Sequence, residues 1–380
     1  MKLTLIKLLL FNSVGSVCRA MGVGRSSSVK AVAFAFYSLA AYAIVASFLL
    51  VHLMGYGFFF FTPGGSALSM RSLNVPILIL FGLDAPLPLR VGAVFLGMWV
   101  VYGVCFVFAW RWRRSFQAVF EGDVSGKRSV FNNFLFAMPL FAGMVLTAAL
   151  AIILFQSAGG IETGMTYLPS DVHEAFLSLA SAPLIEEFVF RLVPVGLLVV
   201  FFVFLAGRNL KALSSFGGRF KLFFLAFVYP EGAKAMAGLP TVGEHGLLRG
   251  ISVPEWVAII GTSAFFGLAH VISPTGWETG KITSAFVQGF FFAVTYVAYG
   301  FEAPILLHWY FNYYNYFFIV EIAESFFPTA IDLLSVIELL TLVLGIVGWV
   351  FFVLEGVRRL LRRQKRKHSQ PLLPPVTFPS

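Results

Sequence analysis

The stretch that decides the fold is AFLSLASAPLIEEFVFRLVPVGLLVVFFVFLA, residues 175–206. Its charged residues lie together near the middle: Glu186, Glu187 and Arg191. A run of about 20 apolar residues spans a bilayer as an α-helix. This run is longer, which predicts a tilted or broken membrane helix. Pro183 and Pro194 are the candidate kink positions, because proline removes a helical hydrogen bond.

The rest of the chain shares this character. Of its 380 residues, 59% are hydrophobic and 12% are charged, and the mean hydropathy is +0.87. A soluble domain carries about 25% charged residues, so the composition excludes a soluble globular enzyme, a disordered chain and a disulfide scaffold. Cys18 and Cys105 are isolated and predict free thiols. The net charge of +9 is not spread over a soluble face, which disfavours nucleic-acid binding.

Eight apolar segments predict an all-α, polytopic membrane protein with about eight transmembrane helices. They are Ala31–Leu53, Val91–Trp110, Phe131–Phe155, Ala175–Ala206, Pro254–Ile272, Ile282–Phe301, Ala303–Val320 and Leu334–Leu354.

The positive charges predict how these segments are oriented. Lys and Arg concentrate in four regions, residues 1–30, 111–130, 207–253 and the tail after Glu355, which together hold 23 of the chain's 27. Because positively charged loops stay in the cytoplasm, we expect a multi-pass protein of the cell membrane with both termini cytoplasmic.

The predicted organisation has five parts. Residues 1–30 form a cytoplasmic or interfacial segment, 31–173 hold three transmembrane helices, and 174–320 form a core interrupted by a cytoplasmic insertion at 207–253. Residues 321–356 hold the last helix, and 357–380 form a basic and then Pro-rich cytoplasmic tail.

A few polar residues lie within the predicted spans. They are Glu186, Glu187, Arg191, His270, His308 and Asn312. An ionisable group at the bilayer centre costs about 2.5–3.5 kcal/mol on insertion scales, and such groups usually serve a function. The other histidines, His52, His173, His245 and His368, lie at span ends or in loops and receive no role.

Helical spacing separates the roles of the two glutamates. Glu187 and Arg191 are four residues apart and can pair on one helix face. Glu186 is rotated by about 100° from Glu187, which leaves it available as a general base. His308 and Asn312, also four residues apart, are a plausible donor pair for an oxyanion. His270 could share proton transfer with Glu186 or bind a metal.

Each feature also has a structural interpretation. The Glu-Glu pair with Arg191 is compatible with a buried ion pair or a proton relay, and an intramembrane histidine can be an interhelical hydrogen bond. Three such features on three spans of a chain so poor in charge favour a functional site.

The ordered pattern Glu186-Glu187-x-x-x-Arg191, Phe266-x-x-x-His270 and His308-x-x-x-Asn312 resembles the CAAX protease and bacteriocin-processing family, also called CPBP or Abi. Its best-known branch is the type II CAAX prenyl proteases. The resemblance covers roughly residues 176–316. The stretch between Arg191 and Phe266 is longer than is usual in that family, which leaves a lid, a substrate collar or a partner-binding insertion open.

The resemblance implies an eight-helix intramembrane endopeptidase. Glu186 would activate a water with help from His270, His308 and Asn312 would stabilise the oxyanion, and Glu187 with Arg191 would hold the geometry. The substrates would be membrane-associated or prenylated-type peptides or proteins in the lipid bilayer, and no nucleic acid. We expect no cofactor, with Zn²⁺ as the minority alternative because two Glu and two His could bind it.

The sequence leaves two alternative functions and one geometric difficulty. The same Glu and His residues could form the relay of a proton-coupled transporter or channel, or the cluster could merely join helices in a silent scaffold. Simple hairpins would also put His270 and His308 at opposite depths, whereas a single site needs both near one water.

Overall fold

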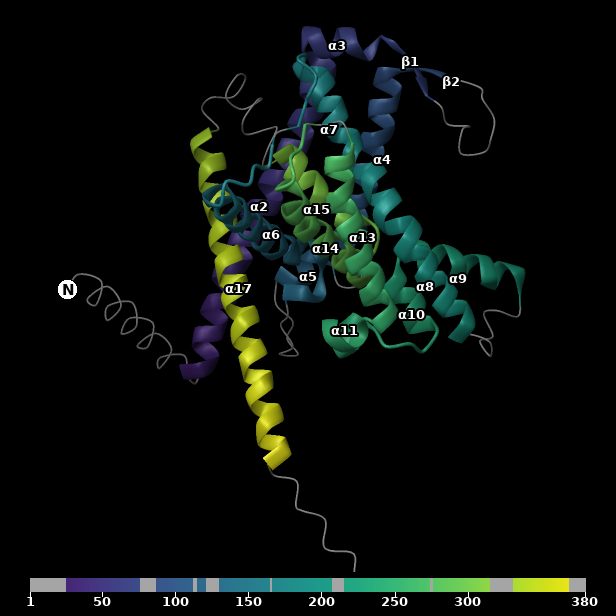
Figure 1. Ribbon diagram of the computed structural model, residues 1–380. Coiled ribbons are helices and arrows are strands. Elements are labelled where there is room, and N and C mark those ends of the chain that lie inside the picture. Colours follow the sequence, from purple (N-terminus) through teal and green to yellow (C-terminus); the bar gives the residue numbers. More distant parts are fainter. Residues whose placement is uncertain are drawn as a thin grey trace, which may run out of the picture.

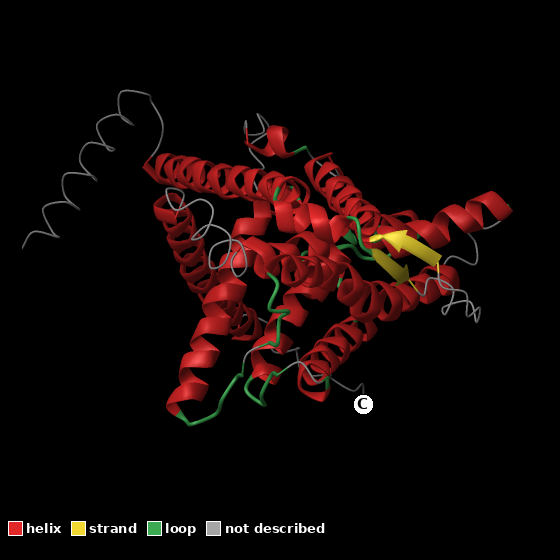
Figure 2. Cartoon of the chain, turned by 90° about the horizontal axis from the view of Figure 1, so that it is seen from above, coloured by secondary structure: helices red, strands yellow, loops and turns green. Residues whose placement is uncertain are grey.

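Long helices make up most of the computed structural model, which describes residues 25–75, 87–111, 115–120, 130–164, 166–206, 215–273, 276–314 and 331–368. Viewed from above, the helices pack around a common centre (Figure 2). The long ones are α2 (Arg25–Phe61), α4 (Val91–Arg111), α6 (Phe134–Ala158), α7 (Val172–Glu187), α8 (Val193–Ala206), α13 (Val253–Ile272), α14 (Lys281–Tyr299) and α17 (Ile331–His368) (Figure 1).

Seven helical stretches of the described residues are long and apolar enough to cross a membrane: α2, α4, α6, α7 together with α8, α13, α14 and α17. This confirms the prediction of an all-α polytopic membrane protein. The eighth predicted span, Ala303–Val320, begins as α15 (Glu302–Trp309) and continues as a π-helical turn to Tyr314. Its remainder lies outside the described residues, so the count of eight stays a prediction.

The long central run is a broken helix, as its length predicted. A π-helical segment, η3 (Phe188–Leu192), joins α7 to α8. The break therefore lies between the two prolines: Pro183 is inside α7, and Pro194 is the second residue of α8. A π-turn changes the helical register, and such turns are frequent at functional sites.

Both chain ends of the described bundle lie at the same end of the molecule. The first residues of α2, the last turns of α17 and the short helices α10 (Pro230–Met236) and α11 (Val242–His245) gather at the lower end in Figure 1. α17 runs on through the basic stretch to His368, so the tail predicted from residue 357 begins as a continuation of this helix. Residues 1–24 and 369–380 lie outside the described residues.

A short hairpin lies at the opposite end, beside helix α3 (Pro63–Ser69) (Figure 1). Its strands are β1 (Ser72–Val75) and β2 (Leu87–Arg90), paired antiparallel with Ser72 opposite Arg90. The sequence pattern did not predict this hairpin. α7 also begins near this end, where Asp171 accepts hydrogen bonds from the backbone N–H groups of His173 and Glu174.

The insertion at 207–253 folds into short helices, described from residue 215 onwards. They are α9 (Phe216–Val228), α10, α11 and α12 (Leu247–Gly250). α9 buries Leu222 and Ala226 against α8 and exposes Phe216, Phe220 and Phe224. It has 13 residues, too few to span a bilayer.

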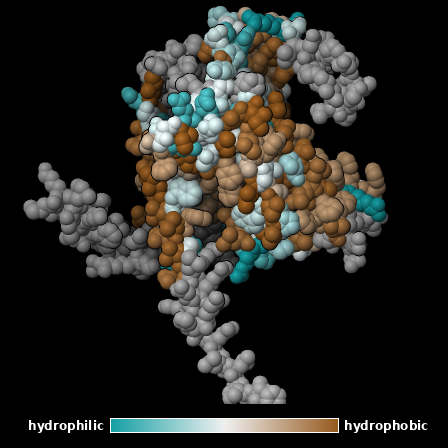
Figure 3. Space-filling view, in the orientation of Figure 1, coloured by the Kyte–Doolittle hydropathy of each residue, from teal (hydrophilic) through white to brown (hydrophobic). Residues whose placement is uncertain are grey.

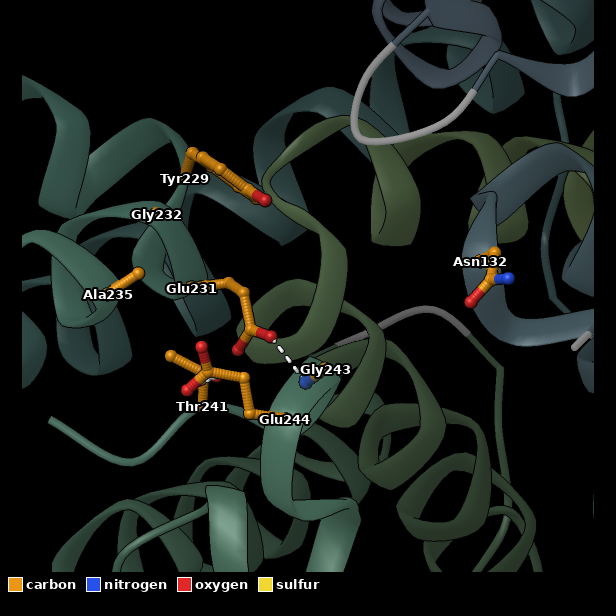
Figure 4. Close-up of a pocket in the computed structure, with 8 residues that line it drawn as sticks. All are labelled: Asn132, Tyr229, Glu231, Gly232, Ala235, Thr241, Gly243 and Glu244. Atoms are coloured by element: carbon orange, nitrogen blue, oxygen red, sulfur yellow. Dashed lines mark hydrogen bonds between the residues drawn. The ribbon is translucent and has the colours of Figure 1, made fainter. Parts of the chain in front are cut away.

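Buried polar contacts hold the insertion together. Lys234 Nζ lies 2.9 Å from both carboxylate oxygens of Glu255 and donates to the Gly250 carbonyl. Figure 4 shows Glu231 pointing at Gly243, and its Oε1 accepts a hydrogen bond of 2.6 Å from the backbone N–H of Gly243. Glu231 and Gly243 border an open pocket of about 290 Å³, lined by Asn132, Tyr229, Glu231, Gly232, Ala235, Thr241, Gly243 and Glu244.

The flank of the bundle is apolar, as expected of a lipid-facing surface. Brown, hydrophobic residues cover most of the described flank in Figure 3. Inside the bundle, α6 and α17 approach closely at Gly143 and Gly345, where an added Cβ would collide with the backbone of the facing helix. Small residues at such crossings let membrane helices pack backbone to backbone.

Candidate active site

Three of the predicted site residues form one buried contact group between α7 and α15. Glu187 Oε1 lies 2.8 Å from His308 Nδ1, and Glu187 Oε2 lies 3.3 Å from Arg191 Nε. The side chains are 2%, 7% and 0% exposed, respectively. Because an ionised carboxylate only accepts hydrogen bonds, Nδ1 of His308 is the donor in this pair. Glu187 therefore joins Arg191 on its own helix to His308 on α15, and the ion pair predicted from the spacing is present.

Glu186 is the more accessible of the two carboxylates. Its side chain is 30% exposed, and its Oε2 lies 3.7 Å from Nε2 of His308, beyond hydrogen-bond distance. That oxygen is itself buried and accepts no hydrogen bond from the described residues. His308 thus stands between the two glutamates, bonded to Glu187 on one side and facing Glu186 on the other.

The guanidinium of Arg191 is enclosed by aromatic rings. It lies 4.2 Å from the ring centroid of Phe266 and 5.4 Å from that of Phe292. A cation over a ring face is attracted by the ring quadrupole. A Cβ at position 289 would lie 2.7 Å from Arg191 Nη2, so Gly289 on α14 leaves the space that the guanidinium needs.

His270 and His308 both lie near the ring of Phe266. The ring centroid of Phe266 is 4.7 Å from that of His270 and 6.0 Å from that of His308. Phe292 of α14 stacks on His308 at 4.8 Å. The intervening helix therefore does not keep the two histidines at opposite depths.

The imidazole of His270 is oriented by its own helix. Its Nδ1 lies 2.8 Å from the carbonyl oxygen of Phe266. Because a carbonyl only accepts, Nδ1 carries the proton, and Nε2 is the acceptor in the neutral ring.

Asn312 lies in the π-helical turn that follows α15, residues 310–314, and is half-buried. Within the described part of the chain, no hydrogen bond joins its amide to another residue. The structure places it about one turn beyond His308 but does not bring it into the contact group. The π-segments of this site, at 188–192 and 310–314, begin one residue after Glu187 and two residues after His308, respectively.

The comparison with known families covers this same region. Residues 168–314 match the family described as type II CAAX prenyl endopeptidase Rce1-like. We refer to them as the Rce1-like segment. This confirms the resemblance that the three motifs indicated, and it indicates an intramembrane CAAX-type peptidase. No curated protein and no solved structure is significantly similar to the chain.

Helices outside the Rce1-like segment hold α15 in place. Trp309 Nε1 donates to His52 Nδ1 of α2 at 3.3 Å, and the hydroxyl of Tyr313 donates to the carbonyl of Val51 at 2.8 Å. His52 is buried and stacks on Trp99 with ring centroids 4.4 Å apart. Sequence reasoning gave His52 no role, because the residues next to it along the chain do not indicate that it contacts Trp309.

Lys281 is a second residue that sequence reasoning missed. It precedes the predicted span Ile282–Phe301, yet it opens α14 within the Rce1-like segment and interacts electrostatically with Glu186. A lysine at the very start of an apolar helix, four residues after a tryptophan, was the available signal.

A metal site was the minority expectation for these residues. In the ranges that the structure describes, no group of three or more His, Cys, Asp and Glu side chains is arranged to hold a metal ion. The residues present do not fit a zinc site with three protein ligands, so no step of the mechanism below passes through a metal.

Proposed function

We propose that the chain is an intramembrane endopeptidase that hydrolyses peptide bonds of membrane-associated or prenylated-type substrates. The observation that carries the proposal is the unequal environment of the two glutamates. Glu187 is buried, hydrogen-bonded to His308 and ion-paired with Arg191, whereas Glu186 is partly exposed and faces the far nitrogen of His308. Pairs of ionisable groups in different environments are typical of acid–base sites.

In the proposed mechanism, Glu186 activates the water. A water in hydrogen-bond contact with Glu186 Oε2 gives up a proton to this carboxylate as its oxygen attacks the peptide carbonyl. His270, whose Nδ1 is bonded to Phe266, presents Nε2 as an acceptor and assists this proton transfer. The captured proton then passes to the leaving amine.

The developing oxyanion needs hydrogen-bond donors. His308 donates from Nε2 when its ring is protonated, because Nδ1 is already engaged with Glu187. Glu187 supplies the counter-charge to that imidazolium, and Arg191 balances Glu187 in turn. Asn312 follows one turn later on the same helical stretch and adds the second donor in this proposal.

The membrane setting completes the proposal. Apolar helices and the Rce1-like match support a multi-pass membrane protein. The described ends of α2 and α17 lie with the insertion at one end of the bundle (Figure 1), and the basic residues there favour the cytoplasm of a cell-membrane protein.

The test is cleavage of a membrane-anchored peptide by the purified protein in liposomes. We expect Glu186→Gln to reduce the rate by at least about a hundredfold, as for loss of a general base. Glu244→Gln, at a carboxylate that is 71% exposed in the insertion, is the matched control and should cleave normally. Undiminished cleavage by Glu186→Gln contradicts the mechanism. Glu186-dependent proton flux across the same liposomes without cleavage would instead favour a transporter.

A further inference from the structure

A wall of two side chains, Trp277 and Lys281, stands beside His270 of the proposed catalytic groups. The ammonium of Lys281 lies 3.9 Å from the ring centroid of Trp277, and the rings of Trp277 and His270 are 6.4 Å apart. Lys281 also interacts electrostatically with both Glu186 and His270. This wall is therefore positively charged, and it lies next to His270, within electrostatic range of the carboxylate that would activate water.

Backbone pairing fixes the position of the wall. Glu278 N donates to the carbonyl of Thr163 and Gly280 N donates to that of Glu162, each at 2.9 Å. Gly164 forms an antiparallel bridge with Trp277 and adopts a φ of +71°, which glycine tolerates best. The loop before α7 thus holds the segment that carries Trp277 and leads into Lys281.

Lys281 has no carboxylate partner at ion-pair distance among the described residues. Its close contact is the ring of Trp277, and Glu186 acts on it only over a longer range. Removing an ammonium from water is costly unless an anion compensates.

Arg191, the other cation near Glu186, is fully buried and paired with Glu187. Lys281 is half-buried, so it is the positive group that a substrate reaching Glu186 would meet. A peptide carries its negative charge as carboxylates, either at its C-terminal end or on acidic side chains. An ammonium is a compact point charge with three donors, well suited to a single carboxylate.

We propose that Lys281 binds a carboxylate of the peptide substrate and so selects where the chain is cut. The proposal rests on the proposed peptidase function and adds a specificity-determining residue to it. The carboxylate would lie within a few residues of the cleaved bond, because Lys281 lies against Trp277, whose ring neighbours His270 of the proposed catalytic groups.

The experiment compares three peptides that are identical except for their ends: a free C-terminal acid, a C-terminal amide, and an amide with glutamate as its last residue. Wild type should cleave at least one carboxylate-bearing peptide with a kcat/KM about tenfold above that of the neutral amide, the size expected of a charge-assisted hydrogen bond. Whichever carboxylate-bearing peptide has the higher kcat/KM shows whether Lys281 binds the C-terminal carboxylate or an acidic side chain.

Lys281→Met should remove this preference, and Lys281→Arg should retain most of it. Lys221→Met, at an exposed lysine on α9, is the matched control and should keep the full preference. A preference that survives in Lys281→Met overturns the proposal, as does a wild type that cleaves all three peptides equally.

A binding measurement separates this proposal from the peptidase function. Fluorescently labelled versions of the three peptides, each with a reduced, uncleavable bond, are titrated with Glu186→Gln and with the Glu186→Gln, Lys281→Met double variant. Tighter binding of a carboxylate-bearing peptide that depends on Lys281 supports the proposal. Equal binding of all three peptides contradicts it, whether or not wild type cleaves peptides. Failure of wild type to cleave any peptide counts against the peptidase function itself.

Discussion

A methyl group added at Gly289 should disable the site without touching a catalytic residue. Gly289 lies on α14, where its missing side chain leaves space for the guanidinium of Arg191. A Cβ at this position would be 2.7 Å from Arg191 Nη2 and 3.0 Å from Phe266 Cδ1. Ordinary contacts of a Cβ begin near 3.4 Å, so Arg191 must withdraw by several tenths of an ångström.

The cost follows from how tightly Arg191 is held. Its side chain is 0% exposed, with Phe266 stacked at 4.2 Å and Glu187 at 3.3 Å. Overpacking of this kind costs about 1–3 kcal/mol. Moving Arg191 also shifts Glu187 and with it His308, and a displacement near 1 Å in a catalytic group can cost about a hundredfold in rate. We therefore expect Gly289→Ala to lower kcat by about ten- to a hundredfold.

The assay is peptide cleavage in liposomes, with the melting temperature in detergent as a check on folding. Gly261→Ala on the neighbouring α13 is the control, because a Cβ there meets nothing within 4 Å. It should keep full activity, with stability unchanged or slightly raised by the better helix propensity of alanine. A folded Gly289→Ala protein with wild-type kcat would refute the reasoning about Arg191.

Three further predictions concern the contact of His52 with Trp309, the N-terminal cap of α7 and the need for a metal. His52→Leu leaves Trp309 Nε1 without its acceptor and should lower kcat about tenfold, whereas His52→Gln, which keeps an acceptor, should retain more activity; equal losses would contradict this role. Hydrogen bonds from the backbone N–H groups of Glu174 and then of His173 lower the pKa of Asp171, so the ionised cap stabilises α7 above about pH 4, and this contribution is lost as the pH falls through the lowered pKa. Asp171→Ala should therefore cost about 1 kcal/mol of stability at neutral pH, measured by thermal melts. An unchanged melting temperature would argue against the cap. A strong chelator should leave peptide cleavage unchanged, and a loss reversed by Zn²⁺ would establish a metal requirement.

The sequence predicted most of the fold because each membrane helix carries its own signal. Apolar runs of the right length located the spans, and the charge-poor composition made the Glu186–Arg191 stretch conspicuous. The ion pair between Glu187 and Arg191 followed from spacing within one helix. The resemblance of the three ordered motifs agrees with the Rce1-like match at 168–314.

What could not be predicted depends on contacts between helices. Nothing in the sequence near His308 shows that its Nδ1 meets Glu187, a residue 121 positions away. The same holds for the contact of His52 with Trp309 and for the electrostatic interaction of Lys281 with Glu186. The two π-turns were also hidden, because they arise where packing shifts the helical register rather than from a residue type.

The central claim is that Glu186 and His308 act together on one water and the bond it attacks. A double-mutant cycle in the cleavage assay tests this most directly, with Glu186→Gln, His308→Gln and the double variant measured against wild type. Residues that act as a unit give strongly non-additive losses. The account predicts that the double variant is scarcely slower than the worse single variant. Losses that multiply would show that the two residues act independently, and that result would contradict the proposed site.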